Sequence, residues 1–311
     1  MILYDRVSWL SMVFRVHGSV MPRIIRRVVA TALLSVVFTY LQRNHTVHLS
    51  LTVTPFLITA LPLGIILGFR NTSSYDRFWE GRKLWGVLVN ASRSLLRQME
   101  TFVIPGAPQD AGLVLAHRRE MAYRLVAFVH ALRVHLRRES DRSGLAPFLG
   151  EAELAALDDE ACPPAAILHR LGADVRIAGE RGWLHSLHAV VLEGTLGQLT
   201  DVVGGCERIK NTPTPISYLI FIHRAVAFYC FLLPFGLADT VKELTPVVVF
   251  FVSYALFSLD AIGDELDDPF RGTENTLPIS SIARAVEIYV RRRLGEKELP
   301  RPLEPQNGVL R

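Results

Sequence analysis

Hydrophobic residues in this sequence are gathered in four long blocks, with polar and charged segments between them. The second block, Leu49 to Phe69, contains no charged residue. Because a helix rises about 1.5 Å per residue, a block of that length crosses a bilayer core of roughly 30 Å. The pattern predicts an all-α integral membrane protein, with transmembrane helices over about residues 24–42, 49–69, 216–237 and 244–262.

The segments outside these blocks are more polar. Residues 72–212 and 263–297 mix charged residues with apolar ones at helical spacing, which predicts a cytoplasmic helical region. The tail 298–311 is rich in proline and is expected to be disordered. We expect residues 1–311 to form a single domain.

Basic residues are distributed unevenly around the predicted spans. Arg43 and Lys242 are the only Lys or Arg in the two short turns between paired spans. Because Lys and Arg are retained on the cytoplasmic side, this bias places both termini in the cytoplasm, in a multi-pass protein of the cell inner membrane. The net charge of +4 is accompanied by no nucleic-acid-binding motif, so we expect a lipid bilayer and no nucleic acid as partner.

One face of the second span carries bulky apolar side chains. Leu61, Ile65 and Phe69 recur at i, i+4 and i+8, so they share one face of a helix. We interpret this stripe as the lining of a pore. In an ordinary membrane helix the same stripe would face lipid or a protein core.

The same span contains residues that affect helix packing. Gly64 and Gly68 form a G-x-x-x-G pattern on the neighbouring face, where another helix can approach closely. Pro62 removes a backbone hydrogen bond and tends to kink a helix, so it acts as a hinge, sets the pore width, or is merely tolerated.

Two charged residues fall inside the last two spans. Arg224 and Asp260 are predicted to lie at similar depth on antiparallel neighbours. Because an unpaired charge at depth costs several kcal/mol, we expect them to form an intramembrane ion pair.

Enzymatic and metal-binding patterns are weak in this sequence. Its three cysteines are widely spaced without a C-x-x-C motif, which argues against a disulfide framework or a structural zinc site. The nearby histidine pairs His130 with His135 and His185 with His188 are more often surface residues than zinc ligands. No Ser-Asp-His or P-loop pattern occurs, and Gly204-Gly205 is interpreted as a helix break. We expect no enzymatic activity and no cofactor.

Several motifs resemble those of the bestrophin family, bacterial members in particular. They are GFRNTSSYDRFWEGRKLWGVLVNASRSL, CERIKNTPTPISY, IGDELDDPFRGTENTLPI and the short RVHGSV near the N-terminus. The resemblance implies a homopentamer of four-span subunits around one central pore, with a hydrophobic neck of three side-chain rings. The matching neck positions are Leu61, Ile65 and Phe69. It also implies a cytoplasmic aperture on the helix before C-E-R-I, which we place at Leu187, with Val190 and Val191 as alternatives.

Calcium activation is a property of eukaryotic members of that family, which carry a run of aspartates after N-P-F-G. Here Thr273 and Thr276 stand where carboxylates would be. Four acidic residues precede the motif: Asp264, Glu265, Asp267 and Asp268. They are weak metal candidates, and we favour roles as helix caps or in salt bridges between subunits.

The resemblance implies an ion channel for small monovalent ions. Anions are expected from the family, and cation permeability remains open for bacterial members. A neck of apolar rings gates by emptying of water when it is narrow. A secondary transporter and a membrane-anchored scaffold are the competing interpretations, although no internal repeat is visible.

Overall fold

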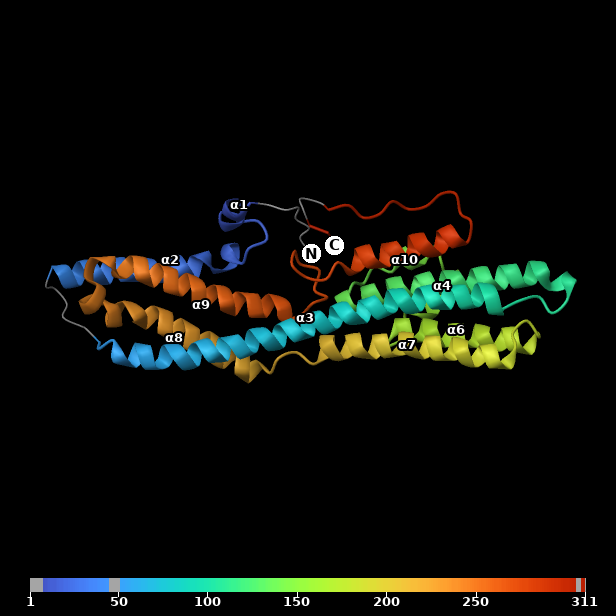
Figure 1. The fold of residues 1–311 in the computed structure, drawn as a ribbon, viewed down its shortest axis with the longest axis horizontal. Coiled ribbons are helices and arrows are strands. Elements are labelled where there is room, and N and C mark those ends of the chain that lie inside the picture. The colour runs from blue at the N-terminus through green and yellow to red at the C-terminus, as the bar shows by residue number, and fades with distance from the viewer. Residues whose placement is uncertain (1–7, 45–50, 306–308, 311) are drawn as a thin grey trace. The chain divides into compact units, whose positions relative to one another are not determined.

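The computed structural model describes residues 8–44, 51–305 and 309–310. It is 77% helical, and no β-strand occurs in these ranges (Figure 1). The chain divides into two compact units. We call Tyr4–Phe78 with Pro213–Asp268 the membrane unit, and Trp79–Thr212 with Pro269–Arg311 the polar unit. The single domain expected over residues 1–311 stays a prediction.

The membrane unit is a bundle of long helices. Its elements are α1 (Trp9–Val13), α2 (Met21–Arg43), the first part of α3 (Thr54–Phe102), α8 (Ile216–Val241), η3 (Lys242–Leu244) and α9 (Thr245–Asp267). Helix α2 lies against α9, and α8 contacts both (Figure 1). Their core joins Val28 of α2, Leu67 of α3, Val226 of α8 and Phe257 of α9.

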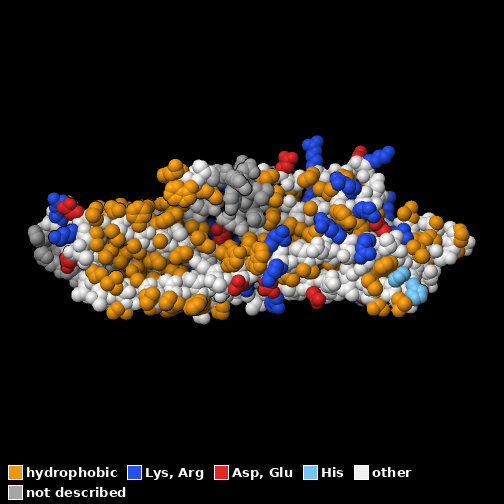
Figure 2. All heavy atoms as spheres, viewed as in Figure 1, with side chains coloured by type: hydrophobic (Ala, Val, Ile, Leu, Met, Phe, Trp, Pro, Cys, Tyr) orange, Lys and Arg blue, Asp and Glu red, His pale blue; other side chains and the backbone are white. Residues whose placement is uncertain are grey.

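The outer surface of the membrane unit is apolar. On the face drawn in Figure 2, hydrophobic side chains cover most of the surface over α2 and α9. Leu33 of α2 and Phe251 of α9 are strongly exposed, with 59% and 62% of their surface accessible. Within the part of the chain that the structure describes, three helical stretches are long and apolar enough to cross a membrane: Met21–Arg43, Thr54–Phe102 and Ile216–Asp267. The third contains both α8 and α9, so each of the four predicted blocks contains a long helix.

Helix α3 runs further than the second predicted span. The block was predicted over 49–69, whereas the helix begins at Thr54 and continues without interruption to Phe102. Leu49 and Ser50 lie outside the described residues. Because the polar residues after Phe69 keep a helical spacing of apolar positions, the helix has no reason to end where the apolar block ends.

The polar unit is a second bundle with the opposite distribution of side chains. Besides the rest of α3 it contains η1 (Pro108–Asp110), α4 (Ala111–Arg137), η2 (Ser143–Leu145), α5 (Glu151–Ala156), α6 (Pro163–Glu180), α7 (Ser186–Asn211) and α10 (Ile279–Arg293). Helix α4 packs against α6, α7 and α10, and its Leu125, Phe128 and Leu132 are completely buried.

The predicted break at Gly204-Gly205 is wrong, because α7 continues through both residues. A Cβ added to Gly205 would lie 2.9 Å from the Leu84 side chain, whereas one on Gly204 would meet nothing within 4 Å. Gly205 therefore allows α7 to pack closely on α3. Glycine at this position is explained by helix packing and not by a bend in the helix.

Candidate functional site

The Leu61, Ile65 and Phe69 stripe faces away from the core of its own chain. Their exposed fractions are 70%, 49% and 68%. Leu63 and Leu67, on the opposite face of α3, are almost completely buried in the core of the membrane unit. One apolar face of α3 is buried and the other is exposed. The exposed face must be covered by lipid or by another copy of the chain.

The residues beside the stripe leave open space along α3. A Cβ added to Gly64 or Gly68 would meet no atom within 4 Å, so no helix of the same chain packs there in the described residues. Pro62 is exposed inside the continuous helix. It lines an apolar cavity of about 640 Å³ between α3 and α8.

A buried charge network lies directly after the stripe. Arg70 is only 2% exposed. One of its nitrogens, Nη1, donates to Asp260 Oδ1 at 2.5 Å, and its Nη2 pairs with Asp264. His223 Nδ1 lies 2.8 Å from the other carboxylate oxygen of Asp260, and Arg27 approaches it at 4.0 Å. Asp260 is therefore surrounded by cationic and hydrogen-bonding groups from α2, α3 and α8.

The predicted ion pair between Arg224 and Asp260 is wrong. Arg224 is exposed, and its neighbour His223 faces Asp260. Successive residues of a helix are about 100° apart, so a shift of one position turns the side chain away from α9. The sequence correctly indicates the depth on α8 at which a partner of Asp260 lies. The main partner, Arg70, is the first charged residue after the second apolar block and was not predicted.

Glycine allows the two helices to meet at this network. A Cβ added to Gly263 of α9 would lie 2.6 Å from Asn71 Oδ1 and 3.2 Å from Arg70 Nε. Any side chain at position 263 would therefore displace Arg70 or Asn71. This close approach fixes the Arg70 guanidinium against α9.

Three of the four acidic residues considered as weak metal candidates are engaged with basic side chains. Arg70 pairs with Asp264, Arg23 with Glu265 at 3.2 Å, and Arg77 with Asp267 at 3.3 Å. Asp267 also accepts a hydrogen bond from Thr214. His223, Asp260 and Asp264 offer donor atoms within 4.8 Å of one another, but the Arg70 guanidinium already binds both carboxylates. A cation would have to displace it.

The fourth weak metal candidate, Asp268, lies immediately beyond α9, where it is the C-cap residue of that helix.

The candidate aperture residues lie in the first turns of α7. Leu187 and Val190 are 71% and 70% exposed, and Val191 is 46% exposed. His185 caps this helix by accepting a hydrogen bond from the Leu187 backbone N–H at 3.2 Å. His188 stacks on Phe102 with the ring centroids 4.2 Å apart. Both histidines therefore have structural partners, and the apolar residues between and after them project outward.

Comparison with known proteins gives consistent matches over the whole chain. The family model described as "Bacterial/Fungal Bestrophin protein" matches residues 1–292. The voltage-dependent anion channel-forming protein RSc3414 of Ralstonia nicotianae is 36% identical over 96% of each chain. The protein of the same description named YneE in Escherichia coli is 35% identical over 98% of each chain.

Solved structures give the same result. A bacterial bestrophin homologue from Klebsiella pneumoniae superposes with a TM-score of 0.80 at 32% identity, covering 88% of this chain and 100% of that chain. The relatives found by sequence are named as channel-forming proteins, which agrees with the expectation that this chain is not an enzyme.

Proposed function

The chain belongs to the bacterial and fungal bestrophin family, and from this premise we propose that it forms an anion channel with Leu61, Ile65 and Phe69 as its neck. The anion preference rests on the names of its relatives, which are described as voltage-dependent anion channel-forming proteins. The pathway is formed by several copies of the chain, each contributing the same face of α3.

The observation that carries the proposal is the exposure of this stripe beside a face without side chains. Leu61, Ile65 and Phe69 project away from their own bundle. Gly64 and Gly68 leave room for the α3 helix of an adjacent copy. A face that only contacted lipid would gain nothing from two glycines, since each weakens a helix by roughly 0.5–1 kcal/mol relative to alanine.

We propose four membrane passes, formed by α2, the first part of α3, α8 and α9. In support, α8 and α9 are separate helices joined by η3, at Lys242–Leu244, and each is long enough for one pass. An even number of passes and the placement of basic residues put both termini in the cytoplasm of the inner membrane. The family resemblance implies five copies around the pore.

The neck controls water. Three rings of apolar side chains offer an ion no replacement for its hydration shell, so a narrow neck empties of water and blocks conduction. Widening by about an ångström or two readmits water and hydrated ions. The positive edges of the Phe69 rings favour anions over cations. Leu187, Val190 and Val191 are proposed to form the second constriction.

Recording from purified protein in planar lipid bilayers tests the proposal. We expect unitary currents whose reversal potential in asymmetric salt follows the chloride gradient. Ile65→Ala and Phe69→Ala should increase unitary conductance, because they remove apolar bulk from the neck. Leu33→Ala, on the exposed face of α2, is the matched control and should leave conductance unchanged.

The same bilayer recordings distinguish the channel from the other interpretations. Saturable flux without unitary currents would replace the channel by a carrier, and neither activity would indicate a scaffold. Unchanged conductance in both neck variants would overturn the assignment of the stripe.

A further inference from the structure

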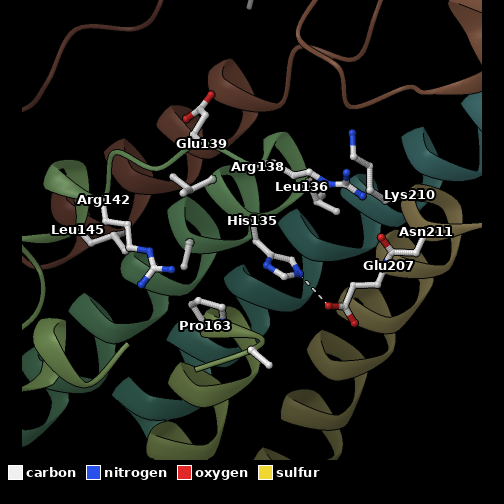
Figure 3. Close-up of a pocket in the computed structure, with 13 residues that line it drawn as sticks. His135, Leu136, Arg138, Glu139, Arg142, Leu145, Pro163, Glu207, Lys210 and Asn211 are labelled. Carbon is white, nitrogen blue, oxygen red and sulfur yellow. Dashed lines mark hydrogen bonds and ion pairs between the residues drawn. The ribbon is translucent and has the colours of Figure 1, made fainter. Parts of the chain in front are cut away.

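Three potential metal ligands from distant parts of the sequence meet in the polar unit. They are His135 on α4, Cys162 at the N-cap of α6 and Glu207 on α7. Their donor atoms all lie within 4.8 Å of one another. In Figure 3 the His135 ring points toward the Glu207 carboxylate, and the Nε2–Oε1 distance is 2.8 Å.

The three residues are held in place by the packing of their helices. Helix α4 contacts both α6 and α7, and α6 contacts α7. Cys162 is fixed because Pro163 and Pro164 begin α6 directly after it. All three residues are partly buried, and His135 and Glu207 line a cavity of about 360 Å³ that also borders on Ala161 and Pro163. The cavity gives a small ion and a solvent molecule access to His135 and Glu207.

The donor set selects the kind of metal. Calcium and magnesium prefer oxygen ligands, whereas one thiolate, one imidazole and one carboxylate suit zinc. In a tetrahedral zinc site with bonds of about 2.0–2.3 Å, donor atoms are about 3.3–3.8 Å apart. The distance of 2.8 Å between His135 Nε2 and Glu207 Oε1 would lengthen slightly on binding. A pair of donor atoms at the upper limit of 4.8 Å would move about 1 Å closer together.

Charged side chains around the cavity affect the binding of a cation. Arg138, Arg142 and Lys210 line it, together with Glu139. Arg142 is engaged with the Asp158 carboxylate and the Leu157 carbonyl, both through Nη1. A zinc ion bound by one thiolate and one carboxylate is neutral overall, so these basic groups have little net charge to repel.

We propose that His135, Cys162 and Glu207 bind one zinc ion per chain, with a water molecule or small anion from the cavity as the fourth ligand. The ion ties α4, α6 and α7 together. On binding, the Cys162 Sγ–H bond breaks, the sulfur donates its electron pair to the metal, and the proton passes to solvent.

Burial raises the pKa of the Cys162 thiol to about 11. A thiol loses its proton when it binds a metal, so zinc binding at this site releases one proton per ion.

Titration of the purified full-length protein with cobalt(II), then with zinc, tests the proposal. Cobalt should give a near-ultraviolet thiolate charge-transfer absorption at one ion per chain, which zinc abolishes by competition. In Cys162→Ser the band should be lost. Its zinc affinity should fall by at least about tenfold, because changes even outside the ligand shell cost about 10–100-fold. The matched control is Cys230→Ser, which removes a buried thiol of the membrane unit and should leave both readouts unchanged.

A measurement on the unaltered protein avoids any effect of the substitution on folding. Zinc should slow alkylation of Cys162, followed by peptide mass spectrometry, and a chelator should restore the rate. Equal alkylation rates with and without zinc, or equal zinc affinity in Cys162→Ser and the unaltered protein, would overturn the proposal. Neither outcome depends on whether the chain conducts ions.

Discussion

The two units of this protein place their polar and apolar residues in opposite ways. In the membrane unit, apolar side chains such as Leu33 and Phe251 are exposed, while Thr31, Arg70 and Asp260 are at most 2% exposed. In the polar unit, the buried side chains are mainly apolar and basic residues pair with acidic ones at the surface. Each unit therefore suits a different solvent, because in lipid only polar groups gain from being turned inward.

The buried charges illustrate this difference. Arg70 of the membrane unit has two carboxylate partners and is almost completely buried. In the polar unit, Arg124 binds Glu153 and Asp174, but its guanidinium also reaches the exposed carboxylate of Glu120. Loss of a partner is therefore expected to cost most in the membrane unit, where water has least access.

The largest expected effect comes from Arg70→Met. The change leaves Asp260 and Asp264 without their main cationic partner, which for a buried pair costs about 3–5 kcal/mol. We expect loss of the assembled protein on size-exclusion chromatography in detergent. Arg224→Met removes an equally basic but exposed residue of the same unit and should assemble normally. Normal assembly of Arg70→Met, or failure of Arg224→Met, would contradict the observed pairing.

Truncating a buried apolar side chain of the polar unit should cost much more than truncating an exposed apolar side chain of the membrane unit. Leu132 is completely buried there, so Leu132→Ala should lower the free energy of unfolding by about 2–5 kcal/mol. Leu33→Ala, on the exposed face of α2, should change it by less than about 0.5 kcal/mol. Thermal unfolding of both variants in the same detergent measures the difference. Equal losses would show that the exposed face of α2 is packed against protein.

A buried carboxylate makes the polar unit sensitive to acid. Burial opposes ionisation of Glu287, but hydrogen bonds from His130 and Arg291 and the charge of Arg284 outweigh it and lower the Glu287 pKa below its ordinary 4.5. A lowered folded-state pKa stabilises the protein above the ordinary value, and this contribution is lost as the pH falls through the lowered one.

Glu287→Gln should therefore cost about 1.5–3 kcal/mol at neutral pH, the usual value for a hydrogen bond to a charged group. The loss should shrink as the pH falls through the lowered pKa, and melting temperature against pH measures it. The control Glu180→Gln removes an exposed partner of Arg176 and should cost less than about 1 kcal/mol at every pH. A Glu287→Gln loss that does not change with pH would contradict the assignment.

The smallest effect compares two adjacent glycines of α7. Gly204→Ala meets no neighbouring atom and should stabilise the helix by about 0.5–1 kcal/mol. Gly205→Ala brings a methyl group to 2.9 Å from Leu84 and forces that side chain to move. We expect Gly205→Ala to be less stable than Gly204→Ala by about 1 kcal/mol in thermal unfolding. Equal stability would show that Leu84 adapts freely.

The sequence predicted those parts of the fold that depend on periodicity. Apolar blocks gave the helices of the membrane unit, and the spacing of Leu61, Ile65 and Phe69 placed them on one face. Their exposure could not be deduced, because an apolar stripe is the same whether it faces lipid, a core or a pore. The helix length of α3 also exceeded its apolar block, since helicity does not end where hydrophobicity does.

Residues that meet only in three dimensions were missed. The sequence indicates how deep a residue lies along α8, but not the direction in which its side chain points around the helix. The prediction therefore named Arg224 as the partner of Asp260, whereas His223 and Arg70 contact it. His135, Cys162 and Glu207 were not connected either, because their proximity depends on the packing of α4, α6 and α7.

We propose that Leu61, Ile65 and Phe69 of α3 line the ion pathway. Modification of Ile65→Cys by a water-soluble, charged thiol reagent during bilayer recording tests it most directly, with Leu33→Cys on the exposed face of α2 as the control. We predict that the reagent changes the unitary current of Ile65→Cys channels and leaves that of Leu33→Cys and unaltered channels constant. An unchanged current in Ile65→Cys channels would show that this face of α3 does not line the ion pathway.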